Sequence, residues 1–490
     1  MTETTSADEK RDQHGDGFSA PDAVASSASG ARTEDGRSLV EVFLQPLKEA
    51  ISASDEMALN ALVDELHPAD FADLISYLEE EERLGLIERL GGRVPSDTLA
   101  ELEPSVAEEI VTAMEPSAVA EAVTELETDD AAFILEDLDE EKRAEILAEV
   151  PVSERIAIHQ AFEYDEDTAG RIMQRDVFAA PGYWTVGQII DRMRGSSDLP
   201  DVFYEVFVID PGFRPVGAVP LSTLLKTARD VVIETIMADD IRVVPVNTDQ
   251  EEVGYLFERY NLISTPVVDD GGRLIGMITV DDVVEIVQEE TGEDMLALAG
   301  VEADSGVLDS VLDTVKSRFS WLAINLATAI IASFVISMFD AAIAQVVALA
   351  VLMPIVASMG GNAGTQTLTV VVRALATKSL TPSNTAKVVW RETQVGFLNG
   401  VLFAVVMGTL AGAWFALTTD NNAAALKLGT VVGVAMIVNL LAAALAGILI
   451  PIALQRAGHD PAVSSAVFVT TVTDVVGFAV FLGLAAIALL

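Results

Sequence analysis

Three hydrophobic patterns follow one another along the chain, and the first has a period of twelve residues. Its apolar positions are Leu66, Leu78, Leu90, Leu102, Met114, Leu126, Leu138 and Val150. Two positions after them stand Pro68, Glu80, Gly92, Pro104, Pro116, Thr128, Glu140 and Val152. Because proline is pre-organised for the first turn of a helix, each unit predicts one short helix and a turn. Helices this short cannot bury an apolar face alone, so the pattern predicts a stacked helical solenoid over residues 38–165.

Short β-branched runs replace this repeat over residues 166–290. The clearer copy lies between Thr265 and Glu290 and reads as strand, Asp-Gly turn, strand and helix. A fainter copy of the same order lies between Val186 and Ala228. The pattern therefore predicts a tandem α/β module.

Five long apolar runs make up the last part of the chain, and each is long enough to cross a hydrocarbon core, which needs roughly 20 residues. They lie at about Phe319–Phe339, Ala341–Ala376, Val389–Leu417, Leu428–Leu454 and Ala462–Leu490. Residues 291–318 mix apolar and acidic positions and predict a connecting helix. The expected fold is a multi-domain membrane protein with an all-α superhelical N-domain, an α/β tandem module and an α-helical five-span domain over residues 319–490.

One segment of the second apolar run breaks the pattern. Pro354 to Gln366 contains a proline, three glycines and Asn362, which are poor residues for a helix facing lipid. We therefore expect an interrupted helix that lines a pore or substrate site. The alternative is a proline kink combined with a small-residue packing face.

Charge is concentrated in the predicted soluble half. Of 76 acidic and 29 basic residues, residues 1–300 hold 67 and 21, and the formal net charge of the chain is −47. This balance argues against nucleic acid as a partner and is compatible with cation binding. Adaptation to high salt is an equally good explanation, since only eight of the basic residues are lysine. The chain has no cysteine, and residues 1–37 are polar, lack an apolar signal core and predict a disordered tail.

The basic residues that flank the spans predict the orientation. Seven lie on the side of the soluble half, whereas only Lys427 lies on the other. By the positive-inside rule, the soluble domains are cytoplasmic and the C-terminus is outside a plasma membrane.

Few ionisable groups lie at membrane depth, where each is costly and informative. Asp474 lies about thirteen residues into the fifth span, near the midplane. It is either a cation ligand or a structural carboxylate bonded to Thr470 or Thr471. Glu392 in the third span is either an ion ligand or the partner of Arg391 in an interfacial ion pair, and Asn439 predicts a hydrogen bond between helices.

The clearer α/β copy closely resembles a CBS domain, with Pro266-Val-Val-Asp and Gly276-Met-Ile-Thr-Val-Asp-Asp282. Tandem CBS copies bind adenine nucleotides or ions in this family, and Thr279 with Asp282 matches its ribose motif. The first copy departs from that motif at Gly217-Ala-Val-Pro-Leu-Ser. The resemblance therefore implies at most one nucleotide site, for ATP or another adenine nucleotide.

The membrane motifs are similar to those of the MgtE family of magnesium channels: Gly360-Gly-Asn-Ala-Gly-Thr-Gln366, Arg391-Glu392, Asp460-Pro-Ala and Thr473-Asp474. The resemblance extends over residues 40–490. It implies a homodimer whose pore passes Mg²⁺ between the second and fifth spans, and that cytoplasmic Mg²⁺ closes the pore. It implies Asp474 as the principal magnesium carboxylate, helped by Asn362 and by neighbouring backbone carbonyls such as that of Gly361. We add Glu392 and Thr470 to the expected pore residues. The cytoplasmic sensor residues that the resemblance implies are Asp249, Glu251, Asp282, Glu285, Glu290, Glu293 and Asp294.

Two other functions stay open on the sequence alone. Interrupted helices also build secondary transporters, here for another divalent cation such as Mn²⁺ or Co²⁺. A membrane enzyme regulated by CBS domains is the second. Because the four histidines lie outside the spans and form no His-Glu-x-x-His motif, the sequence favours a protein that is not a zinc hydrolase of that type.

Overall fold

The computed structural model describes residues 24–25, 32–33, 39–91, 93–196, 199–200, 202–301, 311–419, 421–463 and 465–489. The chain forms two compact units, Met1–Glu163 and Tyr164–Leu490. Most of the predicted tail, residues 1–37, lies outside the described residues. Its described residues form the short strands β1 (Val24–Ala25) and β2 (Arg32–Thr33).

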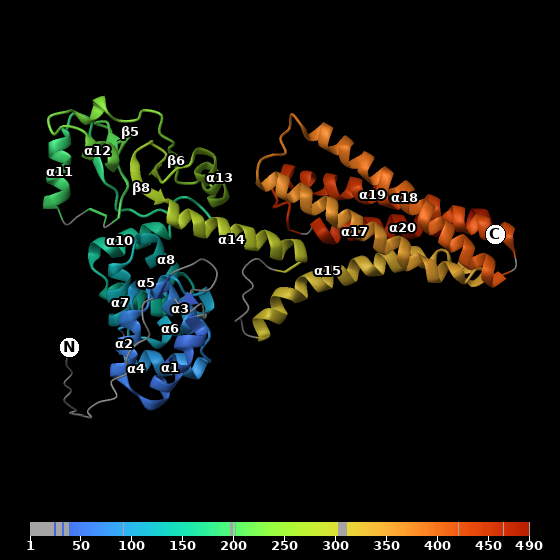
Figure 1. Cartoon of the computed structure of the whole chain (residues 1–490), viewed down its shortest axis with the longest axis horizontal. Coiled ribbons are helices and arrows are strands. Elements are labelled where there is room, and N and C mark those ends of the chain that lie inside the picture. Colours follow the sequence, from blue (N-terminus) through green and yellow to red (C-terminus); the bar gives the residue numbers. More distant parts are fainter. Residues whose placement is uncertain are drawn as a thin grey trace, which may run out of the picture. The chain divides into compact units, whose positions relative to one another are not determined.

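The first unit is a stack of ten short helices among the described residues (Figure 1). These are α1 (Leu39–Ala53), α2 (Glu56–Glu65), α3 (Pro68–Ser76), α4 (Glu80–Leu90), α5 (Ser96–Ala100), α6 (Pro104–Ala113), α7 (Pro116–Glu125), α8 (Thr128–Glu136), α9 (Glu140–Glu149) and α10 (Val152–Ala161). Seven of the eight predicted helix starts are confirmed: those of α3, α4, α6, α7, α8, α9 and α10. Gly92 lies outside the described residues, and α5 begins at Ser96.

The residues of the twelve-residue repeat form the core of this unit. Leu66, at 8% exposed, is the least buried of those in the core, and only Leu126 is partly buried at its edge. Each repeat residue lies just after the end of one helix and before the next, except Leu90, which is the last residue of α4, so one apolar side chain anchors each turn.

The second unit begins with two three-stranded sheets of the same design. The first contains β3 (Ala179–Pro181), α11 (Val186–Gly195), β4 (Glu205–Ile209), β5 (Pro215–Pro220) and α12 (Leu221–Lys226). After the turn η1 (Ile233–Thr235), the second contains β6 (Val244–Pro245), α13 (Gln250–Tyr260), β7 (Ser264–Val268), β8 (Leu274–Thr279) and α14 (Val280–Ala299). In both sheets the first pair of strands is parallel and the second is antiparallel.

Equivalent aspartates close the hairpins of the two sheets. Asp210 Oδ1 accepts hydrogen bonds from the backbone N–H groups of Gly212 and Arg214. Asp269 Oδ1 accepts from Gly271 and Arg273 in the same way. This shared turn chemistry confirms the tandem α/β repeat.

The predicted connecting helix over residues 291–318 is not one element. Its first part continues α14, which ends at Gly300 in the left-handed conformation (φ +74°). Its last part begins α15 (Val311–Ser337), and residues 302–310 lie outside the described residues. The glycine stops the helix because left-handed backbone strains other L-residues.

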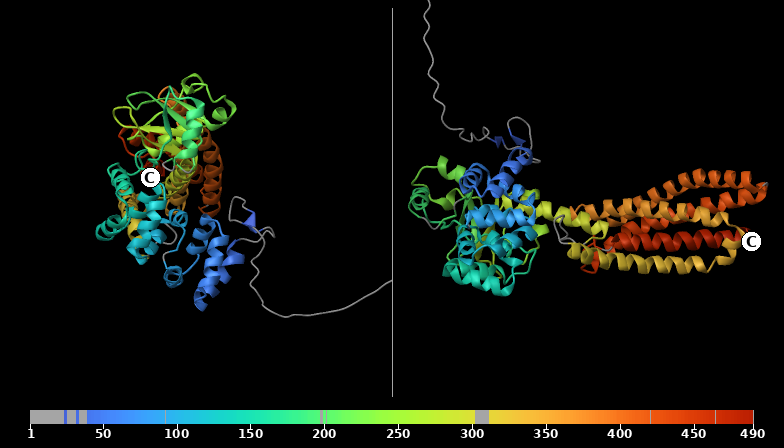
Figure 2. Two further views of the ribbon diagram at one scale, coloured as in Figure 1. Left: turned by 90° about the vertical axis from the view of Figure 1, so that its left-hand side faces the viewer. Right: turned by 90° about the horizontal axis from the view of Figure 1, so that it is seen from below.

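Five helices are long and apolar enough to cross a membrane. They are α15, α17 (Ala348–Ala376), α18 (Thr385–Thr419), α19 (Asn422–Arg456) and α20 (Ser465–Leu489), and they run side by side in the yellow to red part of Figure 2. The predicted interruption between Pro354 and Gln366 is wrong, because α17 is continuous through both. The second apolar run is instead divided at Val346–Val347, where the short helix α16 (Asp340–Gln345) ends.

Close approach of neighbouring helices explains why the glycine-rich part of α17 stays helical. A Cβ on Gly364 would lie 2.5 Å from Val469 Cγ1 of α20, and one on Gly447 of α19 would lie 2.7 Å from the Gly364 carbonyl oxygen. The small-residue packing face, given above as the alternative, therefore describes these glycines.

Candidate pore and cytoplasmic acidic cluster

A fully buried amide joins three helices at the level of the Gly-Gly-Asn segment. Asn439 of α19 donates from Nδ2 to the carbonyl oxygen of Val356 on α17 at 2.8 Å, as predicted for a bond between helices. A Cβ on Gly360 of α17 would lie 2.2 Å from this nitrogen, and one on Gly477 of α20 would lie 2.9 Å from it. The junction fixes α17 against α20.

This junction brings two of the predicted pore segments together. A Cβ on Gly361 would lie 4.0 Å from the hydroxyl of Thr473, the neighbour of Asp474. Thr473 is fully buried, whereas the Asp474 side chain is partly exposed. The carboxylate therefore lies in the same part of the helix bundle as Gly361, at the edge of the packed core.

The alternative role for Asp474 was a structural carboxylate that accepts a hydrogen bond from Thr470 or Thr471, and the hydrogen bonds of these threonines do not support it. Thr470 donates to the carbonyl of Ala466 at 2.9 Å and Thr471 donates to that of Val467 at 2.7 Å. Both hydroxyls are therefore bonded within α20 rather than to the carboxylate.

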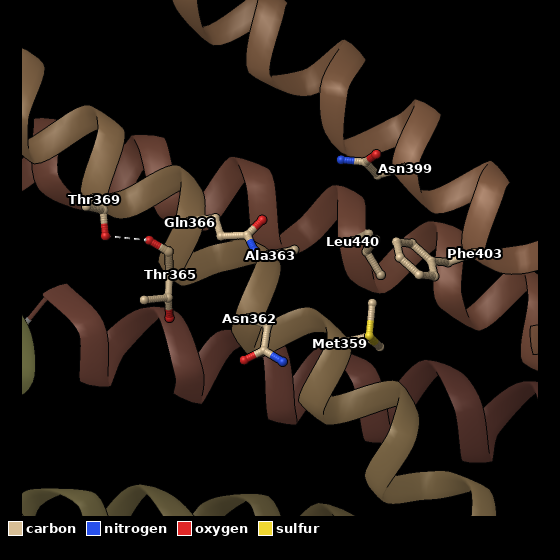
Figure 3. Close-up of a pocket in the computed structure, with 9 residues that line it drawn as sticks. All are labelled: Met359, Asn362, Ala363, Thr365, Gln366, Thr369, Asn399, Phe403 and Leu440. Atoms are coloured by element: carbon tan, nitrogen blue, oxygen red, sulfur yellow. Dashed lines mark hydrogen bonds between the residues drawn. The ribbon is translucent and has the colours of Figure 1, made fainter.

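The face of α17 that points away from the core is polar. Asn362, Thr365, Gln366 and Thr369 are all exposed and follow helical spacing. With Asn399 and Phe403 of α18 they line a cavity of about 470 Å³ (Figure 3). Polar groups in a hydrocarbon core need water or a protein partner, so this face does not suit lipid.

Glu392 lies next to this cavity. It lines a smaller adjoining space of about 120 Å³ together with Gln366 and Asn399. Among the described ranges, no ion pair joins Glu392 to Arg391, which leaves the ion-ligand alternative as the one that its position favours.

Four of the predicted sensor residues lie close together. Asp249 and Glu251 are at the start of α13, and Glu290 and Asp294 are on α14. Burial raises the pKa of Glu251 to about 7, and the negative charges of Glu290, Asp249 and Asp294 add to the effect, although Lys378 opposes it. The pKa of Glu290 is also raised, mainly by burial, while Gln250 donates to its Oε1 at 2.8 Å. Carboxylates held this close repel one another unless protons or cations neutralise them.

The cluster adjoins loops of the membrane helices. Burial and the charge of Asp460, in the loop before α20, raise the pKa of Asp294. Lys378, just after α17, lies 3.5 Å from Glu252 Oε1 and 4.7 Å from the ring centre of Tyr255, both on α13. The α/β module thus meets the membrane helices at two charged contacts.

Asp282, another predicted sensor residue, is not brought into this cluster. Asp282 lies at the opposite end of α14, where its Oδ2 accepts from the hydroxyl and backbone N–H of Thr279 at 2.6 and 3.2 Å and caps the helix. At 1.5 Å per residue, Asp282 is about 18 Å along the helix from Asp294. Glu285 and Glu293 also lie on α14.

Asn399 and Lys378 were not predicted from the sequence as site residues, and Gln366 and Asp460 were noted there only within longer motifs. Two of these residues lie in the spans, Asn399 and Gln366, and two lie in loops, Lys378 and Asp460. The signal for the two in the spans was present, because amides inside apolar spans are as informative as carboxylates. Only the fold brings the two in loops to the acidic cluster.

Five apolar helices with a polar face and a partly exposed carboxylate, joined to a tandem α/β module and a helical solenoid, define a membrane transport protein with soluble domains. Three family profiles match the chain: "MgtE intracellular N domain" at residues 66–167, "CBS domain" at 232–289 and "Divalent cation transporter" at 353–484.

Comparison with whole protein sequences also finds magnesium transporters of the MgtE family. The chain is 31% identical to the magnesium transporter MgtE of Thermus thermophilus over 448 residues, covering 90% of this chain and 98% of the relative. It is 30% identical to that of Enterococcus faecalis, covering 67% and 70%. A crystal structure of the cytosolic domain of the Mg²⁺ channel MgtE in complex with ATP matches 50% of this chain at 28% identity, with a TM-score of 0.47. The chain belongs to the MgtE family of magnesium transporters.

Proposed function

We propose that this protein is a homodimeric channel that carries Mg²⁺ into the cell and is closed by cytoplasmic Mg²⁺. The observation that carries the proposal is the position of Asp474, a carboxylate at membrane depth beside the Gly361 segment of α17. The transport role of the named relatives supports Mg²⁺ as the substrate, and the family's role is transport rather than catalysis.

Asp474 supplies the charge that attracts the ion. Mg²⁺ loses its water shell reluctantly and prefers oxygen ligands in octahedral geometry. The side-chain oxygen of Asn362 and the hydroxyl of Thr470 would contact the waters of a hydrated ion. The backbone carbonyl of Gly361 lies inside the continuous helix α17 and accepts a hydrogen bond from the Thr365 hydroxyl at 3.0 Å, so it is not proposed as a contact of the ion. Glu392 would attract the ion at the cytoplasmic end of the same helix bundle.

A second copy of the chain would complete the pore. The exposed polar face of α17 and the partly exposed Asp474 need a wet or protein surface opposite them. In a twofold dimer the same faces meet across the axis, which would place two copies of Asp474 around one ion path.

The acidic cluster would act as the sensor. When Mg²⁺ is scarce, repulsion among Asp249, Glu251, Glu290 and Asp294 separates the elements that carry them. Bound Mg²⁺ would neutralise the repulsion, favour the compact arrangement and act on α17 and α20 through the contacts at Lys378 and Asp460. We include Asp282, Glu285 and Glu293 as further sensor positions along α14.

The remaining assignments follow from the same proposal. The tail is residues 1–37, the N-domain 38–165, the CBS pair 166–290, the connector 291–318 and the pore domain 319–490. The soluble domains lie in the cytoplasm, the five spans lie in the lipid bilayer of the plasma membrane, and the C-terminus is outside.

An adenine nucleotide is a second ligand for the CBS pair. Thr279 is 3% exposed and already bonds to Oδ2 of Asp282, so Oδ1 of Asp282 is the atom that would accept a ribose hydroxyl. Titration of the whole protein with ATP, with Asp282→Asn as the comparison, tests this assignment.

Flux measurements test the proposed function. Purified protein in liposomes with a fluorescent Mg²⁺ reporter inside should take up Mg²⁺ faster than empty liposomes, and Mg²⁺ on the side of the soluble domains should slow the flux. Uptake that depends steeply on a co-transported ion, or prefers Mn²⁺ or Co²⁺, would favour the secondary transporter instead.

A further inference from the structure

The two cavities beside α17 form one polar groove. The larger, of about 470 Å³, and the smaller, of about 120 Å³, share Ala363, Gln366, Asn399 and Leu440 as lining residues. The groove reaches from Glu392 to Asn362, and Asp474 is not among its lining residues. It therefore includes Asn362 and the polar face of α17 proposed above to line the pore, and it extends from there to Glu392 without reaching Asp474.

Close packing on α19 creates the groove. A Cβ on Gly396 of α18 would lie 2.6 Å from Ala444 Cβ, and one on Gly400 would lie 3.0 Å from Ile437 Cα, so α18 is held tightly against α19. α17 is equally close to α19, because a Cβ on Gly360 would lie 2.2 Å from Asn439 Nδ2 and one on Gly447 would lie 2.7 Å from the Gly364 carbonyl oxygen. The two outer helices consequently leave a gap whose floor is Leu440 and Ala444 of α19.

Polar side chains converge on this gap from both outer helices. Gln366 of α17 and Asn399 of α18 extend toward the same space in Figure 3. Glu392 lies seven residues before Asn399, about 10 Å closer to the cytoplasmic end of α18. Two amides deep in the groove and one carboxylate nearer its mouth suit a cation that enters or leaves on the cytoplasmic side.

We propose that this groove is a second binding position for a hydrated divalent cation, on the cytoplasmic side of Asp474. The Gln366 and Asn399 side-chain oxygens accept hydrogen bonds from the waters of the ion, and Glu392 supplies the charge. Since water takes up roughly 30 Å³ per molecule in the liquid, the larger cavity has room for a cation with its first water shell. The inference deepens the proposed function, because the ion is the transported one.

Cysteine labelling tests the groove separately from transport, because the native chain contains no cysteine. Asn399→Cys and Gln366→Cys, each in the full-length protein in liposomes, are treated with a positively charged methanethiosulfonate. Leu402→Cys and Val370→Cys are matched controls on the same two helices, 65% and 61% exposed outside the groove. The groove thiols should react and the controls should not, and Mg²⁺ should slow the reaction at least severalfold.

Glu392→Gln in the Asn399→Cys background should remove most of this protection by Mg²⁺. Three results would overturn the proposal: thiols that react at the same rate with and without Mg²⁺, unreactive thiols in the groove, or Asn399→Cys crosslinking between two copies. The first means a wet groove without a cation site, the second means lipid in the groove, and the third means that a partner helix fills it. Mg²⁺ uptake by the same proteins is measured in parallel, so a failure of transport is distinguishable from a failure of the groove.

Discussion

At the scale of single residues, buried polar groups set the geometry of the membrane domain. Asn439 is fully buried, and its position between Gly360 and Gly477 leaves no room for a side chain on either glycine. The sequence predicted this bond between helices but not its partner, because the pairing of helices is not encoded in the spacing along one span.

Asn439→Ala should destabilise the membrane domain by about 1–3 kcal/mol, since it removes a buried hydrogen bond and leaves a cavity. Asn325→Ala on the exposed face of α15 is the control and should change stability little. Thermal unfolding in detergent measures both. Equal stability of the two variants would contradict the structural role of Asn439.

The raised pKa of Glu251, about 7, makes cation binding at the acidic cluster depend on pH near neutrality. Protons compete with Mg²⁺ below this value, so inhibition by cytoplasmic Mg²⁺ should need severalfold more Mg²⁺ at pH 6 than at pH 8. The stability of the protein without Mg²⁺ depends on pH in the opposite direction. A carboxyl with a raised pKa contributes to the free energy of unfolding at low pH, and this contribution is lost as the pH rises through 7. Glu251→Gln should flatten the dependence of inhibition on pH, and an unchanged slope would exclude Glu251 as its source.

At the scale of elements, the twelve-residue repeat predicted most helix starts because each start is a local event. Proline at Pro68, Pro104 and Pro116 and an apolar residue two positions earlier define the turn without reference to distant residues. The interruption predicted for α17 failed because the glycines there serve contacts between helices, and propensity along one helix cannot reveal them. The prediction of one connecting helix over residues 291–318 was wrong for a different reason, because the left-handed Gly300 ends α14 within this range.

Leu90→Ala tests the repeat within the whole protein. Leu90 is 1% exposed, and its truncation should lower the free energy of opening of the first unit by about 2–5 kcal/mol. Faster hydrogen exchange across α3–α6 measures this, with the exposed substitution Glu88→Ala as the control. Exchange unchanged in both variants would mean that the repeat residues do not anchor the stack.

Gly447→Val tests the close packing of α17 on α19. Its Cβ would lie 2.7 Å from the Gly364 carbonyl oxygen, so α17 must move away from α19. Mg²⁺ uptake should fall at least tenfold at equal protein content, whereas Gly195→Ala, where a Cβ meets no atom within 4 Å, should leave uptake intact. Wild-type uptake by Gly447→Val would contradict the packing.

At the scale of the whole molecule, the acidic cluster adjoins the membrane helices at two charged loops. Much of the charge of −47 lies on exposed surfaces and needs no ion, but Asp294 and Asp460 face one another where α14 meets the loop before α20. Composition alone could not separate these residues from the other acids, because only the fold places them together.

Asp294→Asn should weaken inhibition by cytoplasmic Mg²⁺ and leave the maximal flux unchanged, because it removes one of the repelling charges outside the pore. Glu154→Gln, a partly exposed acid of α10, is the control. Flux is recorded as Mg²⁺ on the cytoplasmic side is raised, and the same half-inhibiting concentration in wild type and Asp294→Asn would exclude Asp294 from the sensor.

The most direct test of Asp474 as the ion ligand of the pore compares Mg²⁺ uptake by wild type, Asp474→Ala and Asp340→Ala in liposomes at matched protein content. Asp340 is an exposed carboxylate at the start of α16, outside the predicted ion path, and controls for the loss of one charge in the membrane domain. We expect uptake by wild type and Asp340→Ala and at least tenfold slower uptake by Asp474→Ala. Equal uptake by all three proteins would contradict this role and would make Asp474 a structural residue.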